Sequence, residues 1–364
     1  MDIINTGSNA HFIRGNHKRV LMSKNLADIE QFTLYIPKLW EKDWAGAIDM
    51  AAGAQKEILV YQARAANLLK NITDRQATFE KLAWLTMWTK AFTIADSLHG
   101  TLDRNSQYIL EIISRVSFEQ MLHIHTIIQP FHAYHDNTNI PVPAAKKKAW
   151  TEVMGRMQAY TAWCLWNDKL HHEELLDFRT LRGIWDSQPA GKIARSQDER
   201  AKYEAIFGEL DIEADDRVLK KGRLEQQDRG QHNLHRLNTW LTHPQLTPWV
   251  KKIERLSGRR TGKQPVSFFS LFNESEESVC RRLSSMGIRF MYISYIQGSL
   301  FIHGSTMDQI LMFRDGLFTP QFPGNSEEVE SSASYVASLC NNIIVLLSVL
   351  QSHLWPSDKT DKLV

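Results

Sequence analysis

Hydrophobic residues recur at helical spacing along most of this chain, and the strict apolar–polar alternation typical of half-buried strands is rare. No Asn-Gly or Asp-Gly hairpin dipeptide stands between β-branched runs. The pattern predicts an all-α protein, a multi-helix bundle with long helices and little or no β-sheet. We expect helices near residues 26–42, 44–71, 74–99, 103–129, 144–188, 195–221, 244–257, 273–303, 306–315 and 327–354.

Proline and glycine mark the breaks between these helices. Residues 130–143, 258–267 and 316–326 are rich in both and lack periodicity, so we expect three loops there. Pro37 should kink or split the first helix.

A segment of alternating charge divides the chain and predicts a solvated helix pair or an inserted arm. Because the most apolar helices lie on both sides of it, we favour one composite bundle over two. The expected parts are a basic flexible arm at 1–25, an N-terminal helical part at 26–194, a charged helical insertion or linker at 195–229, and a C-terminal helical part at 230–364 that completes the core.

The composition is that of an ordinary globular protein. Of 364 residues, 43% are hydrophobic, which excludes disorder for the chain as a whole. A net charge of +2 argues against a dedicated nucleic-acid coat but allows a local basic patch. Three isolated cysteines, Cys164, Cys280 and Cys340, predict buried free thiols in a reducing cytoplasm.

Residues 333–355 form the most apolar stretch of the chain and raise the question of a membrane. A bilayer span needs roughly 20 consecutive apolar residues, whereas Ser338, Asn341 and Ser348 interrupt this one. The N-terminus lacks the apolar core of a signal peptide. We therefore expect a buried core helix, no membrane contact and a cytoplasmic location.

Two apolar segments carry polar residues at steps of four, which places those residues on one helix face. The first, 103–129, holds Arg115, Glu119 and His123. Buried charges need partners, so Arg115 and Glu119 either pair with each other to fix packing or point into a pocket.

The second segment, 287–303, holds Tyr295, Ser299 and His303 on one face. These groups could line a site together with the first set. Alternatively, Gly304 ends the helix and His303 lies at its C-terminus, where a cation is favoured.

The Arg-x-x-Phe-Glu motif at 115–119 and the Tyr-x3-Ser-x3-His-Gly-Ser motif at 295–305 together resemble a bacterial family of uncharacterised proteins, a domain of unknown function. The resemblance covers roughly residues 100–315. It implies an all-helical fold and a bacterial intracellular setting, and it brings no substrate, cofactor or reaction.

The same family is distantly similar to helical ribonuclease and nucleotide-binding bundles of toxins and anti-phage systems. Their hallmark is an Arg, a polar residue, and a His about a turn and a half onward. Arg229 and His235 have about this spacing, but Gly230 stands at the polar position. A metal-independent ribonuclease would use His303 or His235 as general acid or base and an Arg to stabilise charge.

Other motifs exclude further chemistry. His171 and His172 follow Asp168 on a polar stretch, but the repeated Glu-x-x-His of carboxylate-bridged di-iron bundles is missing. No P-loop is present. We predict neither a metal nor a cofactor.

Basic residues near Trp249 are candidates for nucleic-acid contacts, although a solvated face is the simpler interpretation. They are Lys251, Lys252, Arg255, Arg259, Arg260 and Lys263. Eleven tryptophans are many for this length, and most should lie in the core.

Our leading functional hypothesis is a binding or effector component of a bacterial stress or anti-phage defence system that acts through a protein or nucleic-acid partner. The alternatives are the ribonuclease and a purely structural homo-oligomer. If the protein is an enzyme, the candidate catalytic residues are Arg115, Glu119, Tyr295, Ser299 and His303.

Overall fold

The structure is a computed structural model that carries all side chains. It describes residues 28–103, 107–137, 143–176, 230–258, 266–285, 311–314, 317–320 and 326–356, together with positions 201 and 205. The expected N-terminal arm, the charged segment at 195–229 apart from those two positions, and the predicted motif at 295–305 lie outside these residues.

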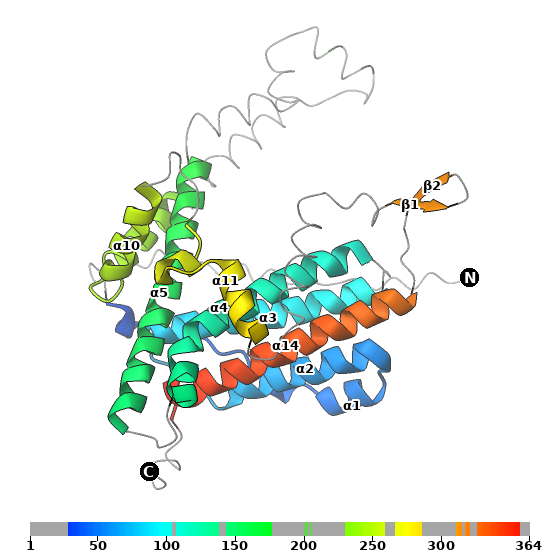
Figure 1. The fold of residues 1–364 in the computed structure, drawn as a ribbon, viewed down its shortest axis with the longest axis horizontal. Helices are drawn as coiled ribbons and strands as arrows, with labels where there is room; N and C mark the ends of the chain where they lie inside the picture. Colours follow the sequence, from blue (N-terminus) through cyan, green and yellow to red (C-terminus); the bar gives the residue numbers. More distant parts are fainter. Residues whose placement is uncertain are drawn as a thin grey trace.

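The described residues form a helical bundle, which confirms the predicted all-α fold class. Four long helices run side by side, and a fifth, α5, crosses them at one end with α10 alongside it (Figure 1). The helices are α1 (Trp44–Asp49), α2 (Gly53–Lys70), α3 (Phe79–Asp103), α4 (Gln107–Asn137), α5 (Pro143–Leu176), α10 (Thr247–Gly258), α11 (Glu276–Ser285) and α14 (Ser326–Leu354). Residues 230–241 are also helical.

One main hydrophobic core unites residues from both sides of the charged segment. It extends from Ile29 near the start of the described chain to Trp355 near its end. The apolar α14 contributes a buried row along its length and packs against α2, α3 and α4. It is long and apolar enough to cross a membrane by composition, and half of its most apolar window is buried within the bundle.

The predicted helix at 26–42 is wrong. Only two short 3-10 turns form there, η1 (Ile29–Gln31) and η2 (Leu39–Glu41). Between them the chain pairs with the connection before α3, where the Leu34 N–H donates to the Arg75 carbonyl at 2.7 Å. These backbone hydrogen bonds between two distant segments replace the bonds that a helix would have made within residues 26–42.

The predicted single helix at 44–71 is two helices, α1 and α2. The chain breaks at Gly53, whose φ of +53° is a left-handed conformation that glycine adopts readily. Close approach adds a second reason, because a Cβ at Gly53 would come within 1.9 Å of the Glu330 carboxylate of α14.

The predicted loop at 130–143 is wrong over residues 130–137, where α4 continues through Pro130 to Asn137; residues 138–142 lie outside the described residues. A proline inside a helix has no N–H for the carbonyl four residues earlier. That carbonyl belongs to Thr126, and the Arg156 side chain of α5 donates to it at 2.6 Å. The guanidinium thus replaces the hydrogen bond that the proline removes.

The predicted helix at 306–315 is wrong over Leu311–Arg314, which forms strand β1. It pairs antiparallel with β2 (Leu317–Pro320), and Arg314 stands opposite Leu317. Asp315-Gly316 lies between the two strands in the sequence, and an Asp-Gly pair favours a two-residue hairpin turn. The runs that flank this pair have almost no β-branched residues, so the hydrophobic pattern alone does not indicate a hairpin.

Tryptophan side chains connect the helices through hydrogen bonds as well as packing. The Trp84 indole N–H donates to the Leu347 carbonyl at 2.8 Å, which joins α3 to α14. The Trp88 indole N–H donates to the Ala65 carbonyl of α2 at 2.9 Å. Both rings are buried, in line with the prediction that most tryptophans lie in the core.

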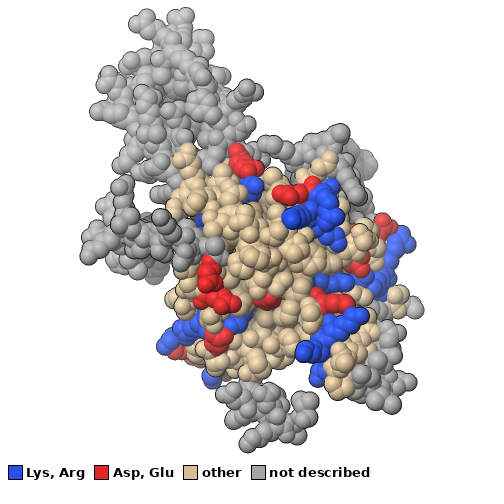
Figure 2. Space-filling view, turned by 90° about the vertical axis from the view of Figure 1, so that its left-hand side faces the viewer, with Lys and Arg blue, Asp and Glu red and all other residues tan. Residues whose placement is uncertain are grey.

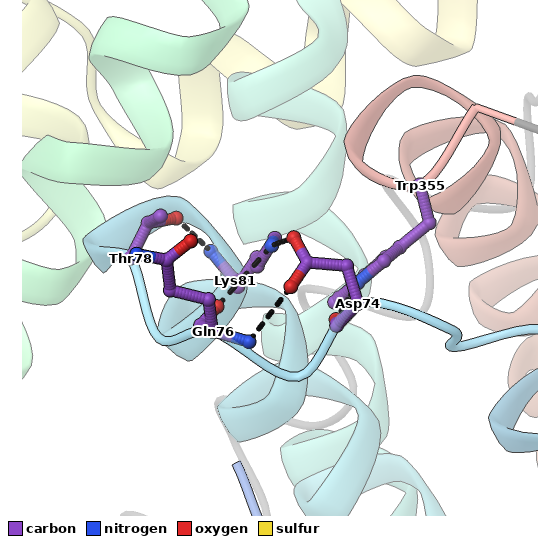
Figure 3. A network of polar contacts seen from close by, with 5 residues as sticks. All are labelled: Asp74, Gln76, Thr78, Lys81 and Trp355. Atoms are coloured by element: carbon purple, nitrogen blue, oxygen red, sulfur yellow. Dashed lines mark hydrogen bonds and ion pairs between the residues drawn. The ribbon is translucent and has the colours of Figure 1, made fainter. Parts of the chain in front are cut away.

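The C-terminal end of α14 is held on the connection between α2 and α3 (Figure 3). The Trp355 indole N–H donates to the Asp74 carbonyl at 2.6 Å. The buried Lys81 ammonium pairs with the Asp74 carboxylate and donates to the Gln76 carbonyl at 3.2 Å. This ion pair lowers the pKa of Asp74, chiefly through the hydrogen bond from Lys81.

We predict that packing outweighs charge in this contact. Trp355→Ala should lower the free energy of unfolding by about 3–5 kcal/mol, because it removes a buried ring and its hydrogen bond. Lys81→Met should cost only about 1 kcal/mol, because the Asp74 carboxylate it leaves is 59% exposed and can be hydrated. Urea denaturation of both variants measures the difference, and equal losses would contradict this ranking.

A double-mutant cycle tests the replacement of the proline's hydrogen bond. Arg156→Met should lower the free energy of unfolding by about 2–3 kcal/mol, because the Thr126 carbonyl then lacks a donor. In a Pro130→Ala background the restored backbone N–H can bond that carbonyl, so the same substitution should cost about 1 kcal/mol less. An identical cost in both backgrounds would refute the coupling.

Candidate functional site

The two described members of the predicted catalytic set lie on α4 beside α11. Arg115 and Glu119 share one face of α4, as their spacing predicted. Tyr295, Ser299 and His303 lie outside the described residues.

Arg115 is bound within the fold. Its guanidinium Nη2 lies 2.5 Å from the Glu276 carboxylate of α11, and the Arg115 side chain is 12% exposed. Burial raises the pKa of Glu276, and the neighbouring Arg115 opposes that rise. The pair joins two helices that are far apart in sequence, so the step-of-four pattern did not reveal it.

His123, one turn beyond Glu119, is enclosed by aromatic rings. Its ring centroid lies 5.1–5.8 Å from those of four aromatic side chains, namely Tyr160, Trp163, Phe268 and Phe269. Burial, with smaller effects from Lys90 and Arg115, lowers the pKa of His123 to about 3. The imidazole is therefore neutral near pH 7 and almost without contact with solvent.

The contact between Glu119 and His123 is not an ion pair at neutral pH. The nearest carboxylate oxygen lies 3.9 Å from Nε2 of a neutral imidazole, too far for a hydrogen bond. The Glu119 side chain is 46% exposed. Its charge therefore faces the surface without a cationic partner among the described residues.

A second polar contact adjoins the histidine, between Lys90 and Tyr160. The Lys90 ammonium donates to the Tyr160 hydroxyl at 3.2 Å. Burial raises the pKa of Tyr160 well above its usual value and raises that of the neighbouring Cys164 to about 11. Both groups stay protonated at neutral pH, so neither is an activated nucleophile.

The other thiols are equally unreactive. Burial raises the pKa of Cys280 to about 12, and that of Cys340 to about 12. All three cysteines are free; Cys280 and Cys340 are buried as predicted, whereas Cys164 is only half-buried. In the described part of the chain, no three His, Cys, Asp or Glu side chains gather as metal ligands would.

The predicted nucleic-acid set is only partly described. Lys251 and Arg255 are exposed on α10, and the half-buried Lys252 lies 5.9 Å from the Trp249 ring. Arg259, Arg260 and Lys263 lie outside the described residues. On the face that Figure 2 shows, basic and acidic side chains lie next to each other around a largely uncharged centre, which does not make a basic path for a phosphate backbone.

An exposed apolar row on α4 was not predicted as a site. Ile109, Ile112 and Val116 are 36%, 37% and 47% exposed. Their spacing of three and four residues places them on one face. The sequence showed these residues as part of an apolar helix, but it could not show which face lacks a neighbour.

The pH dependence of stability should reveal the enclosed histidine. The pKa of His123 is about 3 in the folded protein and about 6.5 in an unfolded chain. Below pH 6.5 the His123 imidazole is protonated in the unfolded chain but stays neutral in the folded protein. The free energy of unfolding therefore falls as the pH falls. His123→Phe removes this effect while keeping a ring among the aromatic side chains.

From pH 7 to pH 5, we expect wild type to lose about 2 kcal/mol more free energy of unfolding than His123→Phe. Urea titrations at both pH values provide the measurement, and other ionisable groups cancel in the comparison. Parallel losses in the two proteins would mean that His123 titrates normally.

No protein-family model, no curated protein and no solved structure matches this chain. The family resemblance drawn from the two motifs therefore stays a prediction.

Proposed function

We propose that this protein is a binding component that docks a helix of a partner protein on the exposed row of α4. The single observation behind the proposal is the placement of apolar surface. Six large apolar side chains are exposed among the described residues, and three of them, Ile109, Ile112 and Val116, share one helix face. Exposed apolar groups that cluster, rather than scatter, are typical of interaction surfaces.

The dimensions of the row suit a helix. Val116 lies seven positions after Ile109, so the row extends about 10 Å along α4. This is two turns, the length over which an amphipathic partner helix places successive apolar side chains.

Charge makes the proposal more specific. Glu119 follows Val116 by three residues and therefore continues the same face. Since its carboxylate is exposed and has no cationic partner among the described residues, a partner helix with a Lys or Arg one turn beyond its apolar residues would complement it.

Catalysis at these residues has less support. A ribonuclease site would need Arg115 to face the substrate, whereas Arg115 binds Glu276 across a buried interface. A binding role needs no such group. A bacterial stress or anti-phage setting is part of the proposal and is supported only by the motif resemblance.

Photo-crosslinking tests the docking surface. A photoreactive phenylalanine analogue at Ile112 should crosslink one partner protein in cells, and the same analogue at the exposed Val345 of α14 should not. With that partner purified, Val116→Lys should weaken binding at least tenfold, about 1.4 kcal/mol, because it places a charge in an apolar contact. Val345→Lys is the matched control and should bind normally.

Charge reversal tests the partner's chemistry. Glu119→Lys should also weaken binding, and replacing the facing basic residue of the partner by Glu should restore it. Crosslinks from position 112 only to a second copy of this chain would instead favour the structural oligomer. Crosslinks to RNA would favour nucleic-acid binding and overturn the proposal.

A further inference from the structure

A groove lies between α2 and α14, and none of its lining residues belongs to the α4 row. The two helices run side by side (Figure 1). The groove has a volume of about 380 Å³, within the range of small-molecule sites. Its lining residues are Lys56, Glu57, Val60, Tyr61, Arg64, Ala337, Ser338 and Asn341.

Small side chains on α14 open this space. Ala337 and Ser338 leave little bulk opposite α2, and the buried Tyr61 contributes to the floor. Contacts between the helices hold the groove at both ends. The Glu330 carboxylate accepts the Ala54 N–H at 3.4 Å at one end.

The other end carries the strongest recognition group. The Arg64 guanidinium donates from Nη1 to the Asn341 side-chain oxygen at 2.6 Å. An arginine has five N–H donors in a planar arrangement that fits a carboxylate. The bond to Asn341 uses one of them and orients the group at the rim of the groove.

The remaining surface is suited to an aliphatic body. The walls are mostly apolar, from Val60 and Ala337, and the lining of α2 extends from Lys56 to Arg64, eight residues or about 12 Å. The carboxylates of Glu57 and Glu330 lie toward the Lys56 end, so the Arg64 end is the one that favours an anion.

We propose that this groove binds a medium-chain aliphatic carboxylate. Its carboxylate pairs with Arg64 beside Asn341, and its chain lies along Val60, Tyr61 and Ala337. The site needs no partner protein, so its test is independent of docking at α4.

Calorimetric titration of the full-length protein with sodium decanoate tests the proposal. We expect a single site with a Kd of about 0.1–1 mM, the strength usual for a ligand of this size. Decanol and decylamine, which keep the chain and lack the anion, should bind at least tenfold more weakly.

Two pairs of variants locate the site. Arg64→Gln should weaken decanoate binding at least tenfold, whereas Arg75→Gln, an exposed arginine outside the groove, should not. Ser338→Trp should fill the groove and abolish binding, whereas Ser331→Trp, at an exposed position on the same helix, should leave it unchanged. Both tryptophan variants replace exposed serines, so thermal unfolding should show folded proteins.

Three results would overturn the proposal. The first is no heat of binding at millimolar decanoate. The second is equal affinity for decanol, which would leave Arg64 without a role. The third is unchanged decanoate binding in folded Ser338→Trp, which would place the ligand elsewhere on the protein.

Discussion

Hydrogen bonds from side chains of one helix to backbone carbonyls of the next are the interaction on which this bundle depends. Apolar packing is weakly directional, so long helices could otherwise slide along one another. The Trp84 indole fixes α3 at the Leu347 carbonyl, and the Gln351 amide fixes α14 at the Leu68 carbonyl of α2. Each bond gives a buried N–H donor its partner, and it also fixes where one helix lies along the axis of its neighbour. Trp84 and Trp88, whose indole N–H groups donate to carbonyls of neighbouring helices, therefore set the register of the helices as well as fill volume.

Within this frame the polar residues of the core serve structure. Arg156 compensates the carbonyl released by Pro130, and Arg115 neutralises Glu276 between α4 and α11. His123 is held neutral by its aromatic surroundings. Groups of these types often mark catalytic sites, but here burial lowers the pKa of His123 to about 3 and raises that of its neighbour Tyr160 well above its usual value, so neither group titrates near pH 7. The two proposed recognition sites, the α4 row and the α2–α14 groove, therefore lie at the surface of the bundle.

The sequence alone predicts the features of the structure that depend on local hydrophobic periodicity. The fold class, the long helices α3, α5 and α14, and the burial of Trp84 and Trp88 follow from spacing alone. It failed where distant segments decide the outcome. Residues near Leu34 pair with Arg75 instead of forming a helix, and Pro130 is tolerated because Arg156 lies nearby in space. The α2–α14 groove was not predicted, because residues 56–64 and 337–341 lie in distant parts of the chain.

The position of α14 in the chain affects how the protein is made. Helices α2, α3 and α4 are complete at Asn137, yet the helix that all three pack against begins only at Ser326. During synthesis, α2, α3 and α4 leave the ribosome with the apolar faces that later contact α14 still exposed. The ribosome must translate almost 190 further residues, from 138 to 325, before α14 begins. During that interval the nascent chain is exposed to aggregation, and a chaperone that shields apolar helices would protect it.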